Sequence, residues 1–96
     1  MIVRLVTLKI APDRVDDFLA LIATYRIEIG GAEGCSFLEI LEDESEPGVF
    51  VTHSHWEDEN ALNRYRRSEL FGQVWPAIKL LLIDKPTARS FQRKIF

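Results

Sequence analysis

Two histidines occur in the segment VFVTHSHW (residues 49–56), whose β-branched and aromatic residues predict a strand. Because His53 and His55 are two residues apart, both rings lie on the same face of that strand. A transition metal would need at least one further ligand from elsewhere, and the sequence shows no such spacing, so we predict no metal site. The remaining interpretations are a general base, for which His53 is the candidate, and histidines that form hydrogen bonds across strands.

Four aromatic side chains follow between the end of this strand and residue 75, and they have the spacing of a pocket wall for a flat ligand. They are Trp56, Tyr65, Phe71 and Trp75. Large aromatic rings also fill the space between a sheet and its helices, so this spacing leaves a pocket and a plain core as alternatives.

Polar side chains that could orient a ligand lie on otherwise apolar faces. Thr52 and Ser54 share a strand face with Trp56. Arg4 in the first strand and Arg26 in the first helix each interrupt an apolar stripe. Such a guanidinium either holds an anionic oxygen in a cleft or extends to solvent. We count Thr52, Ser54 and Arg26 as candidate substrate-binding residues.

The other polar motifs indicate no further site. The acidic run at residues 42–46 lacks the spaced ligands and the glycine of a calcium loop, and it predicts a solvated turn that ends at Pro47-Gly48. Cys35 is expected to be a buried structural thiol. A Ser-His-Asp order, a glycine-rich phosphate loop and a CxxC pair are all absent from the sequence.

Composition limits the class of protein. The 96 residues are 47% hydrophobic and 28% charged, which predicts a single globular domain over residues 1–96. A formal net charge of -3 without a dense basic stripe argues against a nucleic-acid partner. No apolar run approaches the roughly 20 residues of a membrane span. The single cysteine excludes an intramolecular disulfide and favours a reducing, cytoplasmic location.

Hydrophobic periodicity and turn residues predict a strand, a helix, two strands, a pair of helices and a last strand. The predicted ranges are 1–10, 13–29, 35–43, 49–56, 61–67 with 69–82, and 87–96. We expect Gly30-Gly31 to end the first helix in the left-handed cap conformation. Asp58 and Ser68 should cap the two later helices. Pro76 predicts a kink or a local rupture in the last helix.

The first strand is apolar on both sides, because Val6 and Leu8 point one way while Val3 and Leu5 point the other. One layer of helices can cover only one of these faces. The order of elements predicts an α+β, ferredoxin-like antiparallel sheet with helices on one face. We expect the other face to pair with a second copy of the chain in a homodimer.

Three blocks of sequence resemble a known family over nearly the whole chain. They are the opening IVRLVTLKIAPDRVDDFLAL, the Gly34-Cys35 start of the second strand, and HWEDENALNRYRRSELFGQVWP. The last block has a tryptophan that ends a strand, an acidic turn, Ala-Leu, an aromatic residue and Ser-x-x-Phe. On these motifs the chain resembles the antibiotic biosynthesis monooxygenase (ABM) family of the dimeric α+β barrel superfamily.

The resemblance implies a dimeric barrel with one cavity per subunit, between sheet and helices. Several relatives oxidise phenols or quinols with molecular oxygen and without metal or flavin, because the deprotonated substrate supplies the electrons. Such a site needs a dry aromatic lining and donors that stabilise the developing anion. By this resemblance Trp56 and Tyr65 are candidate catalytic residues together with His53, while Phe71 and Trp75 would bind a small aromatic substrate without any cofactor.

Two other branches of the superfamily fit less well. In heme-degrading relatives an asparagine, a tryptophan and a histidine ligand would fall at Val6, Tyr65 and Trp75, and Val6 cannot hydrogen-bond a distal ligand. The helical histidine of a sugar-phosphate isomerase branch would fall at Tyr65.

The leading hypothesis is a cofactor-independent monooxygenase for a small aromatic or quinol-like compound. The alternatives are a non-oxidative isomerase or small-molecule binding protein, and a structural dimerisation module with a solidly filled interior.

Overall fold

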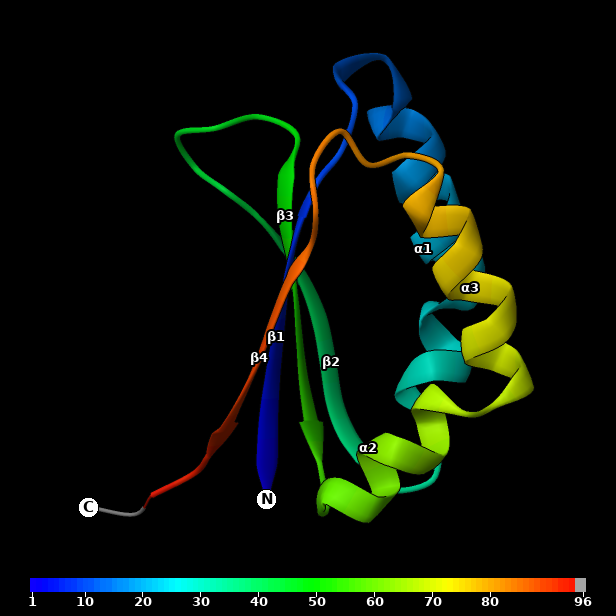
Figure 1. Ribbon diagram of the computed structural model, residues 1–96, viewed down its shortest axis with the longest axis vertical. Helices are drawn as coiled ribbons and strands as arrows, with labels where there is room; N and C mark the ends of the chain where they lie inside the picture. The colour runs from blue at the N-terminus through cyan, green and yellow to red at the C-terminus, as the bar shows by residue number, and fades with distance from the viewer. Residues whose placement is uncertain (95–96) are drawn as a thin grey trace.

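The computed structural model describes residues 1–94 and confirms the predicted order of elements (Figure 1). The strands are β1 (Ile2–Lys9), β2 (Cys35–Glu42), β3 (Val49–Trp56) and β4 (Thr87–Gln92). The helices are α1 (Val15–Gly30), α2 (Glu59–Arg66) and α3 (Glu69–Lys79), and a 3-10 turn (Pro12–Arg14) precedes α1.

The strands form one antiparallel sheet in the order β2-β3-β1-β4. All three helices lie on the same side of this sheet, and the other face carries no element of the described chain (Figure 1). In the register of the sheet, Arg4 stands opposite Ser54 on β3 and opposite Ser90 on β4. The ferredoxin-like α+β arrangement predicted from the sequence is confirmed.

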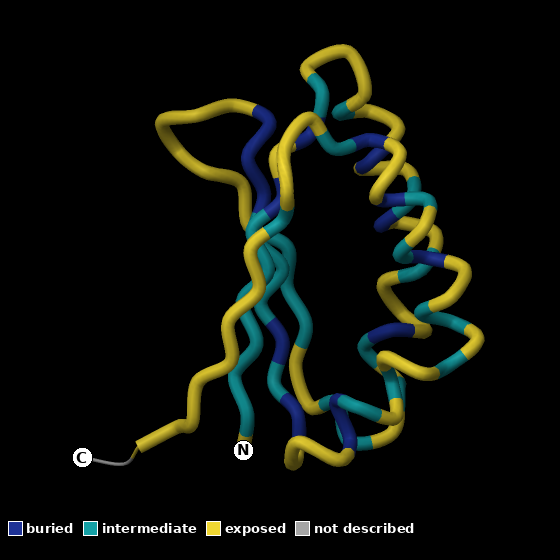
Figure 2. The backbone as a smooth tube through the Cα atoms, viewed as in Figure 1, coloured by how far each residue is buried: buried dark blue, intermediate teal, exposed yellow. Residues whose placement is uncertain are grey.

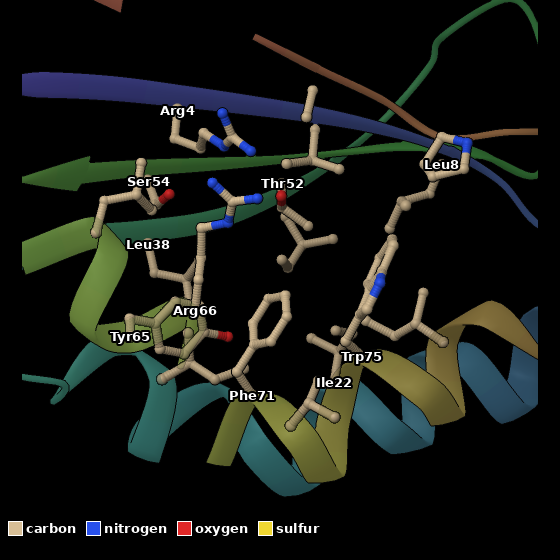
Figure 3. Close-up of a pocket in the computed structure, with 18 of the residues that line it drawn as sticks. Arg4, Leu8, Ile22, Leu38, Thr52, Ser54, Tyr65, Arg66, Phe71 and Trp75 are labelled. Atoms are coloured by element: carbon tan, nitrogen blue, oxygen red, sulfur yellow. The ribbon is translucent and has the colours of Figure 1, made fainter. Parts of the chain in front are cut away.

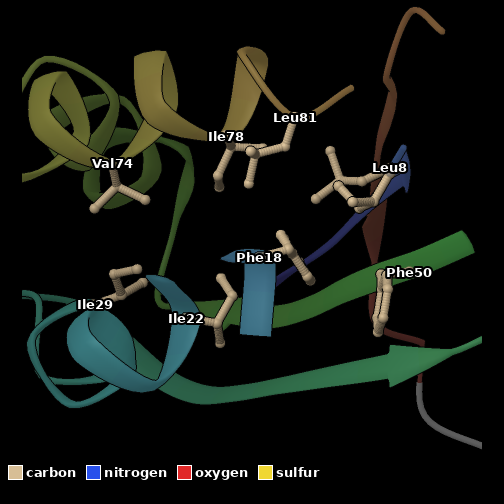
Figure 4. Close-up of a cluster of buried hydrophobic side chains, with 9 residues drawn as sticks. Leu8, Phe18, Ile22, Ile29, Phe50, Val74, Ile78 and Leu81 are labelled. Carbon is tan, nitrogen blue, oxygen red and sulfur yellow. The ribbon is translucent and has the colours of Figure 1, made fainter. Parts of the chain in front are cut away.

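The core lies between the sheet and the helices, where alternate residues of β1 and β3 meet the apolar stripes of α1 and α3 (Figure 4). Its buried members are Leu8, Ile10, Phe18, Ile22, Ile29, Phe50, Val74, Ile78 and Leu81. Burial of one such large side chain stabilises the fold by about 1.5–3 kcal/mol. By contrast, β4 is exposed along its whole length (Figure 2).

The end of α1 differs from the prediction. Gly30 is still helical, and Gly31 has φ -91°, so the predicted left-handed cap is wrong. The Gly31 N–H donates to the Ile27 carbonyl, and the chain leaves the helix in an ordinary right-handed turn. The left-handed conformation occurs instead at Gly34, with φ 85°, at the start of β2. A side chain there would collide with Ala61 on α2, so close packing of β2 on α2 requires the glycine.

Both predicted N-caps of the later helices are confirmed. The Asp58 carboxylate accepts a hydrogen bond from the Ala61 N–H at 2.8 Å, and the Ser68 hydroxyl accepts one from the Phe71 N–H at 3.1 Å. However, α3 continues through Pro76, so the predicted rupture of that helix is wrong. Pro76 lacks the N–H that would donate to the carbonyl of Gly72 four residues earlier, and the helix continues without that hydrogen bond.

The last strand is shorter than predicted. β4 ends at Gln92 because it pairs with β1, and its partner at that point is Ile2, the first residue of β1. Arg93 and Lys94 follow the strand, and the Arg93 N–H donates to the Met1 carbonyl at 3.4 Å. Residues 95 and 96, which the prediction included, lie outside the described residues.

Candidate active site between the sheet and the helices

A cavity of about 260 Å³ lies between the inner face of the sheet and the helices (Figure 3). Residues from every strand and every helix contribute to its lining, and most of them are apolar. The space between the two layers is therefore not solidly filled, which disfavours a purely structural module.

The four aromatic residues singled out in the sequence come together on one wall of this cavity. The ring of Trp56 stacks on that of Tyr65 with centroids 5.0 Å apart. Phe71 meets the Tyr65 ring edge-on at 5.3 Å and stacks on Trp75 at 6.1 Å. The chain of contacts runs from the end of β3 across α2 to α3, so three elements separated by turns build a continuous aromatic surface.

Tyr65 contributes a phenol to this aromatic wall. Burial, with a smaller contribution from Cys35, raises the pKa of the Tyr65 hydroxyl to about 12. Desolvation disfavours the phenolate, so the hydroxyl stays protonated at neutral pH. Tyr65 can therefore donate a hydrogen bond to a ligand oxygen, but it cannot act as a general base under ordinary conditions.

Ser54 and Thr52 place hydroxyl groups on the sheet wall of the cavity, on the same face of β3 as Trp56. The buried Trp56 Nε1–H donates to the Ser54 oxygen at 2.9 Å, which holds the indole in place. The Ser54 hydroxyl proton remains available to a ligand, since that bond uses only a lone pair of the oxygen.

Three arginines, Arg4, Arg26 and Arg66, line the cavity from β1, α1 and α2. Arg4 is held by a 2.9 Å hydrogen bond from its Nη1 to the Ser90 oxygen on β4. Burial, and after it the positive charge of Arg66, lowers the pKa of the Arg4 guanidinium below its usual value. Arg4 remains charged at neutral pH, because arginine does not lose its proton in proteins. The cavity thus combines apolar walls with concentrated positive charge.

His53 lies on the opposite face of the sheet and does not line the cavity, so the fold separates it from the other candidate residues. Its Nδ1 is 2.9 Å from a Glu39 carboxylate oxygen, and its Nε2 is 3.0 Å from the Nε2 of His55. The Phe37 ring packs against both imidazoles. Residues 53 and 56 differ by an odd number, so their side chains point to opposite faces of β3.

The sequence did not single out Arg66, which lies in the basic run RYRR and reads as part of a solvated helix face. The sequence nevertheless contains one pattern that could have indicated Arg66. Arg66 follows Leu62 by four residues, and residues at that spacing share a helix face. Because Leu62 is buried, Arg66 is directed toward the same interior.

No Asp, Glu, His, Lys or Cys side chain lines the cavity within the described residues. In residues 1–94 there is also no group of three or more His, Cys, Asp or Glu side chains placed to hold a metal ion. Polar chemistry in this cavity therefore depends on hydroxyl and guanidinium donors among the side chains that surround it.

Known proteins resemble this chain in sequence pattern and in fold. The family model described as antibiotic biosynthesis monooxygenase matches residues 1–75. No curated protein sequence matches the chain. Because the family match includes β1 to β3, α1, α2 and most of α3, it covers nearly all of the elements that line the cavity.

Solved structures of low sequence identity share the fold. A conserved protein from Methanosarcina mazei Go1 has a TM-score of 0.91 at 22% identity, covering 98% of this chain and 94% of that one. A structure described as antibiotic biosynthesis monooxygenase has a TM-score of 0.91 at 22% identity, covering 99% and 100%. A Deinococcus radiodurans protein that carries the same family name has a TM-score of 0.90 at 20% identity, covering 100% and 95%.

Proposed function

Because this chain belongs to the antibiotic biosynthesis monooxygenase family, we propose that it is a cofactor-independent monooxygenase that oxidises a small aromatic or quinol-like compound with molecular oxygen. In that reaction a phenol and O₂ give a quinone and water. One oxygen atom enters the ring, the other leaves as water, and the substrate supplies all the electrons. The reaction thus needs a site that binds a flat ring and stabilises its anion.

The single observation that carries the proposal is the aromatic-lined cavity. Its volume of about 260 Å³ lies just below the range of roughly 300–1,000 Å³ typical of small-molecule sites, so it suits a compound of one or two rings. Trp56 and Tyr65 stack on each other and line the cavity, and Phe71 and Trp75 extend the same wall, so such a ring would lie in an aromatic environment.

The polar residues of the cavity would then orient the ring and stabilise its charge. We assign Tyr65 as the hydrogen-bond donor to the substrate oxygen, because its hydroxyl stays protonated. Trp56 shapes the site and is fixed by Ser54. Thr52, Ser54 and Arg26 would contact polar groups of the substrate. His53 has no part in this scheme, since it lies on the other face of the sheet.

Oxygen uptake by metal-free protein with a panel of phenols and quinols tests the proposal. We expect uptake with at least one compound, and a Tyr65→Phe variant should lower its rate by about 100-fold, the usual effect of losing one donor to a developing anion. The control is Tyr25→Phe, the same change at the other tyrosine, which does not line the cavity.

Two results would count against the proposal. One is the absence of uptake by folded protein across a broad panel, and the other is an equal loss of rate in both tyrosine variants. The raised pKa of Tyr65 adds a further requirement. Its hydroxyl should not titrate below about pH 10, so the pH profiles of wild-type protein and Tyr65→Phe should have the same shape over that range.

A non-oxidative isomerase or small-molecule binding protein is the second candidate, and the basic lining formed by Arg4, Arg26 and Arg66 is the observation in its favour. Mass spectrometry of the product separates the two candidates. An oxygenase raises the product's oxygen content, whereas an isomerase leaves the mass unchanged.

We further propose that two copies of the chain pair through the uncovered sheet face. This face presents Phe37 and Leu41 of β2 and Phe91 of β4, with exposed fractions of 37%, 44% and 40%. Val3, Leu5 and Val51 lie between them on the central strands. Exposed apolar side chains gathered on one sheet face are typical of an interaction surface, and here they surround the polar residues Glu39, His53 and His55 of the same face.

The cytoplasmic location predicted from the single cysteine stays a prediction. Among residues 1–94, the helices are too short or too polar to span a bilayer.

A further inference from the structure

We propose that the cavity selects aromatic carboxylates, with the carboxylate held between the guanidinium groups of Arg4 and Arg66 and the ring held on the wall formed by Trp56 and Tyr65. The inference that the ligand is aromatic rests on the proposed function. The choice of a carboxylate rests on the charge of the cavity.

Arg4 and Arg66 converge on the cavity from two different elements. Arg4 extends from the middle of β1, and Arg66 extends from the last turn of α2, and both reach into the space between the two layers (Figure 3). They approach closely enough for the charge of Arg66 to lower the pKa of Arg4. Two like charges that converge on an apolar space repel each other, and an anion between them would relieve that repulsion.

No acidic side chain of the described residues forms an ion pair with these arginines. The ion pairs within residues 1–94 are Lys9–Asp84, Arg14–Asp17, His53–Glu39 and Arg64–Glu33, and none of them includes an arginine of the cavity. The cross-strand neighbours of Arg4 are Ser54 and Ser90, and the Ser90 oxygen accepts from its Nη1. This bond uses one donor of a guanidinium that has five.

A carboxylate is the anion that best fits two guanidinium groups beside an aromatic wall. A guanidinium presents a planar fork of donors that matches the two oxygens of a carboxylate, and two such forks can bind the same group. The cavity lining contains no Asp or Glu within the described residues, so no carboxylate of the protein competes with a ligand carboxylate for these donors. The aromatic wall would accept the ring, since Trp56 and Tyr65 line the same cavity as Arg66.

The test is isothermal titration calorimetry of the full chain with 2-naphthoate and with its neutral isostere 2-naphthamide. Neither probe is a phenol, so binding is measured without turnover. We expect 2-naphthoate to bind about 10- to 100-fold more tightly than 2-naphthamide, as a charged hydrogen-bond pair predicts. Arg66→Gln and Arg4→Gln should each remove most of that preference by weakening the binding of 2-naphthoate.

Arg67→Gln is the matched control, because it makes the same charge change one residue further along the chain at a position that does not line the cavity. It should leave both affinities unchanged. Equal affinity for the two probes, no binding of 2-naphthoate, or an equal loss in Arg67→Gln and Arg66→Gln would overturn the inference. Arg66 is exposed on a helix, so its variant is expected to fold even where Arg4→Gln does not.

Failure of this inference and failure of the proposed function give different results. Oxygen uptake with neutral phenols, together with no preference for 2-naphthoate, would retain the oxygenase and overturn the carboxylate site. Selective binding of 2-naphthoate, without oxygen uptake by any phenol or hydroxylated aromatic acid, would support the site and count against the oxygenase.

Discussion

At the scale of single residues, the pair Trp56 and Ser54 determines the shape of the cavity. Trp56 is 1% exposed, and its indole N–H has the Ser54 hydroxyl as its partner at 2.9 Å. A buried donor that loses its partner retains the full penalty of its desolvation. The orientation of the indole, and with it the face offered to Tyr65, therefore depends on one small side chain two residues away on the same strand.

We expect Ser54→Ala to lower the free energy of unfolding by about 1–3 kcal/mol, because it leaves the Trp56 N–H unsatisfied. Urea denaturation at a fixed protein concentration measures this change. Ser36→Ala is the control, since it makes the same substitution at an exposed position of β2 and should change stability by less than about 0.5 kcal/mol. Equal losses in both variants would show that the Trp56 hydrogen bond does not contribute measurably to the free energy of unfolding.

At the scale of elements, glycines determine how closely the helices approach their neighbours. Gly34 has φ 85° and lies against Ala61, so β2 begins in direct contact with α2. Gly72 lies on the exposed side of α3, with open space around it. The first glycine is required by its backbone conformation and by the close contact. The second only weakens a helix that would be more stable with alanine.

These two glycines should respond to the same substitution with opposite signs. We expect Gly34→Ala to destabilise the fold by about 1–3 kcal/mol, through strain at positive φ and collision with Ala61. Gly72→Ala should stabilise it by about 0.5–1 kcal/mol, through helix propensity. Thermal unfolding of the two variants and of the wild-type protein measures both changes in stability. If Gly34→Ala leaves the thermal stability unchanged, Gly34 and Ala61 are not in close contact, and β2 and α2 do not pack tightly at this position.

At the scale of the whole molecule, helices cover one face of the sheet, while the other face is uncovered and exposes apolar side chains. The outer face also carries the cluster of Glu39, His53 and His55, over which Phe37 packs. Burial is the largest influence on His55, and with the charges of His53 and Arg93 it lowers the pKa of His55 despite an opposing effect of Glu39. A neutral ring is compatible with an apolar interface, so the histidines fit the proposed pairing of two copies better than they fit catalysis.

We expect Phe37→Lys to shift the protein from dimer to monomer at micromolar concentration, because it places a charge on the proposed interface. The control is Ile27→Lys on α1, which replaces a side chain that is 80% exposed and lies on the helix layer. Light scattering coupled to size-exclusion chromatography measures the mass of each variant. A wild-type chain that is monomeric and well folded, or a dimer that persists in Phe37→Lys, would contradict the proposed pairing.

Much of this protein could be predicted from local patterns in the sequence. Alternation along VFVTHSHW placed His53 and Trp56 on opposite faces of a strand, and the capping residues Asp58 and Ser68 marked the later helices. The aromatic residues of the cavity were identified as a set from their spacing. These features depend on residues a few positions apart, whose relation is determined by the repeat of a strand or helix.

Only the tertiary structure decided which strand face meets the helices, and hence that His53 lies away from the cavity while Ser54 lines it. It also decided that Arg66 shares the cavity with Arg4, that α3 continues through Pro76, and that about 260 Å³ remains open between the layers. Each of these outcomes depends on how elements distant in sequence pack together. Local periodicity describes the faces of each element, but it contains no information on which faces meet or on how completely they fill the space between them.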